Sequence, residues 1–427
     1  MIGKSLSWRA VAVAILSVAA TAADAHGRSG DPEVVIEWNQ ILEGVLPAGG
    51  LTPPRNYAMV HIAMFDAINS ITRTHRPYRT SVWAPWGASA EVAAAQAARD
   101  VIVAQFPTAQ ATADAALQAR VASVGERQAK SGIQVGKAVA AAILAWRQND
   151  GWTVAPPAYV LPAFPGFYQP TPPAFPAPGF RQFERTEPFA LLTSTQYLPA
   201  GPPTVTSERY AADFEEVKSI GSATSSIRTA EQTQTAQLFA SVTSRTVHWA
   251  LWNHVARDTA RSNGLSLIQT ARLYALLNVS IHDGLQQSHT AKFIYGMWRP
   301  VTAIRRADED MNAVTIADPS WTPLLGTPTY PSHPGNQACV GASAARALAL
   351  THGTDDVAFT AVWQGNTGNP DVSRPYLRFS QLAEDQANSR IYGGIHFRYE
   401  SIASQQACPK VAEYVNARFM RPTLWSH

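Results

Sequence analysis

Several features are scarce or missing in this chain of 427 residues. Cys339 and Cys408 are the only cysteines, too few for a disulfide framework. Charged residues make up 15%, the formal net charge is +3, and no basic run occurs, so nothing favours a nucleic-acid partner. No H-E-x-x-H, C-x-x-C or P-loop pattern is present. After residue 25 no segment offers the roughly 18 uninterrupted apolar residues of a membrane span. We therefore expect neither a nucleic-acid site nor a membrane span in the mature chain.

The N-terminus is typical of a secretory signal. Lys4 and Arg9 give a positive start, residues 10–20 form an apolar core, and Ala23-Asp24-Ala25 fits a small-x-small cleavage site. The pattern predicts a signal peptide at 1–25, a mature start near His26, and an exported protein, periplasmic or secreted. An uncleaved anchor is the alternative. Export permits a bridge between the two cysteines, and two buried free thiols are the other interpretation.

Helical periodicity dominates the mature chain, and long strand alternation is absent. An N-terminal helical region at 26–150 is followed by a Pro-rich and aromatic segment at 151–206 and a C-terminal helical region at 207–427. Apolar positions recurring at three and four predict an all-α fold. The expected helices are 31–48, 56–74, 88–106, 109–127, 130–148, 207–220, 229–243, 246–261, 265–287, 336–352, 378–392 and 395–418. We see no internal repeat with a fixed period.

The segment 151–206 differs from the rest in composition. Its prolines block regular helix, while its aromatics argue against a solvated linker. We predict an ordered loop that wraps on the helical body and lines the mouth of a pocket.

Three later stretches carry the chemistry, namely AKFIYGMWRP (291–300), YPSHPGNQA (330–338) and SRIYGGIHFR (389–398). Together they supply Lys292, Arg299, Arg390, His396 and a Gly-containing turn that opens a helix. Cationic side chains and free backbone N–H groups suit a tetrahedral oxyanion such as phosphate or vanadate. Lys292 and Arg299 are seven residues apart, so on one continuous helix they would share a face.

The order and spacing of these blocks resemble a known superfamily. K-x6-RP, a Pro-Gly turn before a helix and SR-x5-H are similar to the motifs of the vanadium-dependent haloperoxidases and type 2 phosphatidic acid phosphatases. Residues 298–305, 318–325 and 55–71 resemble its soluble bacterial haloperoxidase branch. The resemblance implies a multi-helix bundle of the vanadium haloperoxidase and acid phosphatase type. Because the superfamily includes dimers and larger assemblies, an oligomer is compatible with it.

The resemblance also implies roles for the site residues. His396 would be the catalytic residue that binds the metal of vanadate, and Lys292, Arg299 and Arg390 would neutralise the vanadate oxygens. N–H groups around Gly335, Asn336 and Gln337 would complete the cofactor site. Hydrogen peroxide and a halide would be the substrates. Alternatively, phosphate would occupy the site, and His396 would form a phospho-histidine with a phosphate ester, as in an acid phosphatase. Glu400, one turn beyond His396, is a candidate to orient the imidazole.

One departure from the superfamily pattern concerns proton transfer. The usual P-S-G-H reads Pro334-Gly335-Asn336-Gln337 here, so glycine replaces the serine and glutamine replaces the acid–base histidine. An amide cannot exchange a proton near neutral pH as an imidazole can. A catalytically impaired oxyanion-binding homologue is therefore a third interpretation. His333 lies four positions before Gln337, but the resemblance gives it no role.

Overall fold

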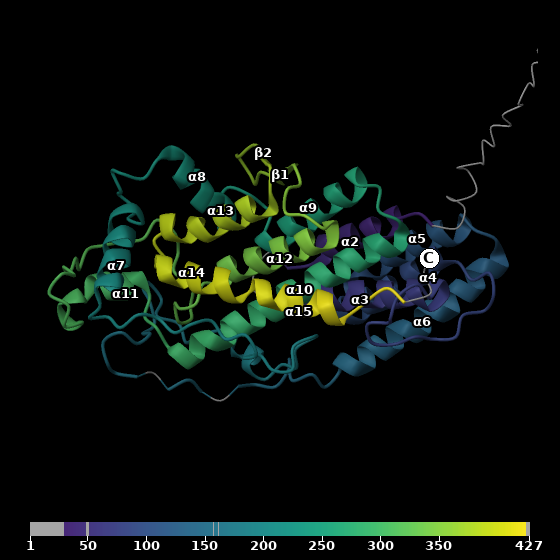
Figure 1. Ribbon diagram of the computed structural model, residues 1–427, viewed down its shortest axis with the longest axis horizontal. Helices are drawn as coiled ribbons and strands as arrows, with labels where there is room; N and C mark the ends of the chain where they lie inside the picture. The colour runs from purple at the N-terminus through teal and green to yellow at the C-terminus, as the bar shows by residue number, and fades with distance from the viewer. Residues whose placement is uncertain (1–29, 48–50, 157, 161, 424–427) are drawn as a thin grey trace, which may run out of the picture.

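The computed structural model describes residues 30–47, 51–156, 158–160 and 162–423. The predicted signal peptide lies outside the described residues. The molecule is an elongated stack of helices in which α10 and α12 lie side by side near the centre (Figure 1). The all-α fold class predicted from the sequence is confirmed.

The N-terminal helices form one end of the molecule. They are α2 (Glu33–Val45), α3 (Pro53–Thr72), α4 (Ala90–Gln105), α5 (Gln110–Ala122) and α6 (Glu126–Arg147). Two prolines open α3, where their missing N–H groups cost nothing, and Ser89 caps α4 by accepting from Val92 N. Helix α3 is buried on nearly all sides, as its continuous apolar sequence predicts.

The C-terminal helices form the centre and the other end. They are α7 (Glu208–Ile220), α8 (Ala230–Phe239), α9 (His248–Ser262), α10 (Leu267–Tyr295), α11 (Pro300–Arg305), α12 (Asn336–His352), α13 (Phe379–Tyr392), α14 (Arg398–Ala407) and α15 (Pro409–Arg418). The prediction of one helix over 395–418 is wrong. Pro409 lacks an N–H group and cannot continue α14, so the chain bends at Cys408 and starts α15.

A small hairpin departs from the purely helical expectation. Strand β1 (Phe359–Trp363) pairs antiparallel with β2 (Val372–Tyr376). The inward residues of β1 are buried, and its ring Phe359 stacks on Phe379 of α13. The hairpin is too short to give a clear alternating pattern in the sequence.

Two helix pairs share short residue patterns, although the sequence shows no repeat with a fixed period. Trp38-Asn39 of α2 matches Trp252-Asn253 of α9. The spacing Tyr57, His61, Asp66 in α3 matches Tyr274, Asn278, Asp283 in α10. The related side chains meet in the core, where Asn39 donates to Asn253 at 2.9 Å and Asn278 contacts His61 at 3.3 Å.

Of the segment 151–206, the described residues 151–156, 158–160 and 162–206 are irregular apart from a 3-10 turn at Arg181–Glu184. It lies along the helices, and Tyr168 and Phe183 are fully buried. Tyr168 N donates to Gly296 O at 2.6 Å, and Trp298 N donates to Gly166 O at 2.9 Å. The segment therefore fixes the turn that follows α10.

Cys339 of α12 and Cys408 form a disulfide, with their Cα atoms 5.3 Å apart. The bridge ties the first turn of α12 to the junction of α14 and α15. The sequence left open a disulfide or two buried free thiols, and the structure has the disulfide.

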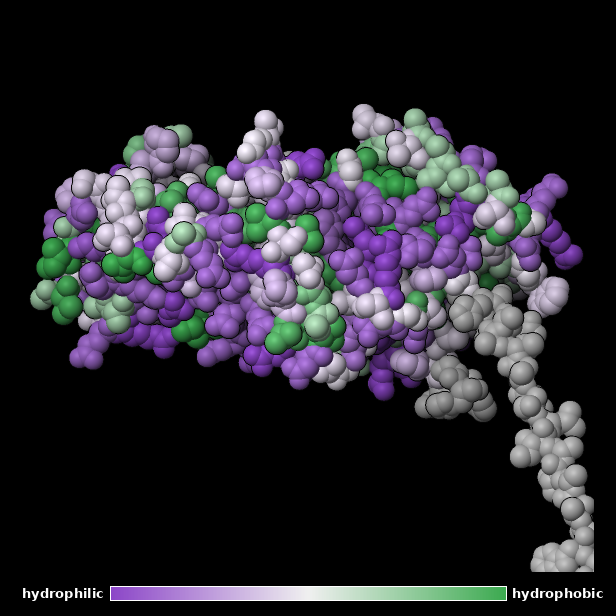
Figure 2. All heavy atoms as spheres, turned by 90° about the horizontal axis from the view of Figure 1, so that it is seen from above, coloured by the Kyte–Doolittle hydropathy of each residue, from purple (hydrophilic) through white to green (hydrophobic). Residues whose placement is uncertain are grey.

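Among the described residues, no helix is both long and apolar enough to cross a membrane. The face in Figure 2 is mostly hydrophilic, with hydrophobic residues in scattered groups.

Candidate functional site

Lys292 and Arg299 are both fully buried but do not share a helix. Helix α10 ends at Tyr295, and Gly296 takes a left-handed conformation with φ of 61°. Arg299 then precedes α11 as its N-cap residue. The condition of one continuous helix, under which the two residues would share a face, is therefore not met. The turn at Gly296 brings Arg299 back toward the end of α10, and a glycine suits it because a side chain would strain this backbone.

Lys292 and Arg299 are held by backbone carbonyl groups of the connection that leads into α12. Lys292 Nζ donates to Ser332 O at 2.6 Å and also to Pro334 O. Arg299 Nε donates to Tyr330 O at 2.8 Å. Both cations also lie over the Tyr330 ring, at 5.5 Å and 5.1 Å from its centre. These contacts fix the positions of the cations without cancelling their charge.

His396 lies between α13 and α14 rather than on a helix, which corrects its predicted placement. Gly394, with φ of 73°, turns the chain so closely against Gly221 that a Cβ would lie 2.3 Å from Gly221 O. His396 Nε2 is 3.2 Å from Arg299 Nη1. Since a guanidinium only donates, Nε2 must accept there, so it carries the lone pair.

Glu400 holds the other face of this imidazole. His396 Nδ1 donates to Glu400 Oε2, which also accepts from Ser332 Oγ at 2.9 Å and Phe397 N at 3.2 Å. Glu400 is fully buried. The carboxylate therefore fixes the tautomer that leaves Nε2 free to bind a metal or attack phosphorus.

Arg390 completes the group of cations from the last turn of α13 and is only 7% exposed. Its Nε and Nη1 atoms are buried without a hydrogen-bond partner, as is Nη2 of Arg299. Buried guanidinium donors are costly to leave unpaired. A tetrahedral oxyanion offers the acceptors that these donors lack, so the site fits vanadate or phosphate.

The pKa values reflect an excess of buried positive charge. Burial, followed by the charge of Arg299, lowers the pKa of Lys292 well below its ordinary value. Burial lowers the pKa of Arg390 to about 10 and raises that of Glu400 to about 7. Burial and the three cations hold the pKa of His396 well below its usual range, so its ring is neutral. An anion in the site would offset this charge.

The turn before α12 contributes differently from the prediction. Gly335 N donates to Glu400 O at 3.1 Å, so this N–H group is already engaged. The Asn336 side chain joins α12 to α10 by accepting from Ser288 Oγ at 2.9 Å and contacting His289 Nδ1 at 3.0 Å. The first-turn N–H groups of Asn336, Gln337 and Ala338 have no acceptor within the described residues. These groups and the positive end of α12 are available to an anion.

Gln337 faces a cavity of about 370 Å³ that also reaches Arg390. Its Nε2 donates to Phe239 O at 3.4 Å, and its Oε1 is buried without a partner. His333 is 1% exposed, and its Nε2 donates to Ala200 O at 2.8 Å. Burial lowers the pKa of His333 to about 4. His333 is not among the residues that line this cavity.

The structure thus brings Lys292, Arg299, Arg390 and His396 together with the start of α12. Sequence reasoning did not identify Tyr330 and Ser332 as members of the site, although both lie within the quoted block 330–338. Their position inside that block was the available signal. Within the described residues no group of three His, Cys, Asp or Glu side chains could hold a metal ion. The site offers one imidazole and several cations, which is the donor set for an oxyanion.

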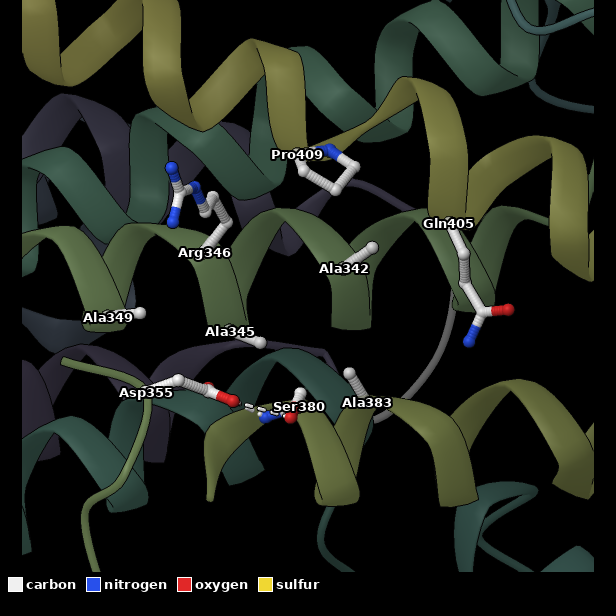
Figure 3. A pocket seen from close by; sticks show the side chains of 9 residues that line it. All are labelled: Ala342, Ala345, Arg346, Ala349, Asp355, Ser380, Ala383, Gln405 and Pro409. Atoms are coloured by element: carbon white, nitrogen blue, oxygen red, sulfur yellow. Dashed lines mark hydrogen bonds between the residues drawn. The ribbon is translucent and has the colours of Figure 1, made fainter.

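A groove of about 320 Å³ on α12 is separate from this site (Figure 3). Ala342, Ala345 and Ala349 of α12 line it together with Arg346, and Asp355 bonds to Ser380 across it. None of the site cations lines this groove.

Comparison with known proteins agrees with this geometry. Residues 272–423 match the family model of the VCPO second helical-bundle domain. The fold is similar to that of the first bacterial vanadium-dependent iodoperoxidase, with a TM-score of 0.78 and 20% identity over 92% of this chain and 97% of that one. It is also similar to a holo-type bacterial vanadium-dependent chloroperoxidase, with a TM-score of 0.68 and 15% identity over 91% and 94% of the two chains. A search of curated proteins gives no match.

The fold is therefore that of the helical vanadium haloperoxidases. Residues 272–423, which include Lys292, Arg299, Arg390 and His396, match this family's second helical-bundle domain, in agreement with the resemblance of the motifs.

Proposed function

We propose that this protein is a vanadium-dependent haloperoxidase that uses hydrogen peroxide to oxidise a halide at a vanadate held by His396. One observation carries the proposal. The lone pair of a neutral, buried imidazole lies among Lys292, Arg299 and Arg390, and guanidinium donors of the two arginines lack acceptors. This donor set fits one tetrahedral oxyanion bound through a single nitrogen.

Each residue has a defined task in this proposal. His396 Nε2 holds the metal, while Glu400 keeps the proton on Nδ1. Lys292, Arg299 and Arg390 supply preorganised positive charge in a site from which water is largely excluded, where charge is most effective. The chemistry that vanadate supplies when bound is Lewis-acid activation of hydrogen peroxide toward a halide.

Phosphate has the same shape, so an acid phosphatase is the alternative. A phosphatase with a phospho-histidine needs an acid to protonate the leaving alcohol, and such an acid typically contributes about 10²–10⁴-fold. The amide of Gln337 cannot serve as that acid. The alternative is therefore the weaker one, and the match to the VCPO second helical-bundle domain supports the haloperoxidase.

We further propose that the protein is exported. The sequence of residues 1–25 supports this proposal, as does the bridge between Cys339 and Cys408, because disulfides persist mainly in oxidising compartments.

The test is peroxide-dependent bromide oxidation by the purified protein, with and without added vanadate, beside hydrolysis of an aryl phosphate. The proposal predicts bromination that requires vanadate and is inhibited by phosphate. Phosphate-ester hydrolysis without bromination would support the phosphatase, and absence of both activities would support a binding homologue.

A further inference from the structure

The cavity beside Arg390 is the part of the site that the roles above leave unexplained. It lies between the end of α8, the starts of α9 and α12, and the last turn of α13. Its lining consists of Phe239, Ala240, Ser241, Val242, Val247, His248, Trp249, Leu325, Gly326, Gln337 and Arg390. Most of these side chains are apolar or small, so the few polar ones decide its chemistry.

His248 and Arg390 are the only ionisable side chains in this lining. His248 opens α9, and its ring contacts that of Trp249 at 4.2 Å between centres. Among the residues that the structure describes, none forms a hydrogen bond with the His248 ring. An imidazole that faces a cavity without a partner is free to exchange a proton with a molecule inside it.

His248 and His333 differ in what surrounds them. His333 is sealed from solvent and its Nε2 is committed to Ala200. His248 instead shares its cavity with Gln337, the position at which related motifs carry an imidazole. Of these two histidines, the geometry favours His248 for proton exchange.

We propose that His248 is the group that accepts a proton from hydrogen peroxide in this cavity, in place of an imidazole at position 337. The inference rests on the proposed haloperoxidase function. Hydrogen peroxide gives one proton to the free nitrogen of the His248 ring and becomes the hydroperoxide anion beside Arg390. The imidazolium then releases the proton to solvent through the cavity, so the neutral ring is restored.

The electrostatics of the cavity agree with a base that acts only when the site is loaded. Burial, followed by the charge of Arg390, lowers the pKa of His248 to about 3. In this state the ring is neutral but a weak base. An anion bound to Arg390 offsets that charge, so the pKa of His248 rises toward its ordinary value and the base becomes stronger.

The first test compares His248→Gln with the matched change His254→Gln on the same helix, since His254 lies outside this cavity and contacts Glu43 instead. We expect His248→Gln to lower kcat/KM for peroxide by about 10²-fold, the usual contribution of a positioned base. We expect the vanadate affinity of His248→Gln, measured by calorimetry, to equal that of the wild type. The kcat/KM of His254→Gln should also equal that of the wild type. Adding Gln337→His to the His248→Gln protein restores activity, because it returns an imidazole to the cavity.

The second test is an NMR titration of the His248 ring in the wild-type protein, with and without vanadate, so that no variant has to fold. We expect its pKa to rise when vanadate binds. An unchanged pKa, or a His248→Gln variant with wild-type kcat/KM, would overturn the inference while leaving the proposed function intact. A wild type that neither binds vanadate nor oxidises bromide would overturn both.

Discussion

Helices α3 and α10 are both buried on nearly all sides and share a Tyr-x8-Asp spacing, but they differ in how far they continue after the aspartate. Each helix has an aspartate nine residues after a tyrosine. Each aspartate accepts hydrogen bonds from backbone N–H groups of an irregular segment. Asp66 accepts from the N–H groups of residues 78–80, and Asp283 accepts from those of residues 189–191. Helix α3 ends six residues after Asp66, whereas α10 continues for twelve residues after Asp283.

The added length of α10 is what creates the site. Twelve residues extend the helix by about 18 Å, compared with about 9 Å for six. The extension carries His289 and Lys292 to the turn before α12. The corresponding end of α3 carries Arg73, which is exposed and contacts Ser70 O at 3.5 Å. The two helices therefore share the tyrosine and aspartate positions. Of the two, α10 alone extends far enough to contribute to the anion site.

The largest effect should come from His396→Ala. Because His396 Nε2 supplies the imidazole lone pair that lies beside Arg299, bromide oxidation should fall to the level measured without vanadate. The control is His75→Ala, which removes an imidazole near the end of α3. Equal activity losses in the two variants would contradict the role of His396 as the residue that holds vanadate.

Lys292→Gln tests the extension of α10 directly. Removing one preorganised donor from an oxyanion site typically costs about 10²–10³-fold, and we expect vanadate affinity to fall by this amount. Calorimetry measures it. Arg73→Gln, at the end of α3, should bind vanadate as the wild type does. A loss of vanadate affinity as large as that of Lys292→Gln would contradict the claim that the extension of α10 creates the site.

Asp66 allows a test by pH, because burial raises its pKa from 3.8 to about 6 despite three N–H donors. A folded-state pKa above the unfolded value stabilises the protein at low pH. That stability is lost as pH rises from about 4 to about 6, by up to about 3 kcal/mol. Asp66→Asn should remove this pH dependence of the unfolding free energy, measured by denaturant titration. The control Asp356→Asn, which changes an exposed aspartate, should retain the pH dependence of the unfolding free energy. Parallel curves for wild type and Asp66→Asn would contradict this assignment.

Glu400→Gln should have the smallest effect. The amide can still accept from His396 Nδ1 through its oxygen, but it no longer supplies a negative charge. Loss of such a partner behind a metal ligand typically costs about 10–100-fold in affinity or activity. Steady-state kinetics with vanadate in excess separates a loss of activity from a loss of vanadate affinity. The exposed Glu413→Gln serves as control, and an unaffected Glu400→Gln would show that a neutral acceptor for Nδ1 suffices to orient the imidazole.

The sequence predicted the helical fold and the charged members of the site for a clear reason. Long amphipathic or buried helices leave a strong period, and Lys292, Arg299, Arg390 and His396 stand in blocks with recognisable spacing. The turn at Gly296 was harder to predict, since Gly296 and Pro300 are compatible with more than one path. Contacts between distant segments, such as Gly335 N with Glu400 O, leave no local signal.

His248 is a second example of a contact that the sequence alone does not predict. It lies in no motif, and 89 residues separate it from Gln337, so only the folded chain shows that both line one cavity. The clamp of Asp283 on residues 189–191 likewise joins positions more than 90 residues apart. Residue chemistry can be recognised in a sequence, but proximity between remote helices depends on packing.

The most direct test of the central claim is a calorimetric titration of vanadate into the purified wild-type protein, repeated with phosphate present. We predict that one vanadate binds per chain and that phosphate competes for the same site. Failure of both anions to bind would contradict the claim that the extension of α10, the start of α12 and the His396 turn form an oxyanion site.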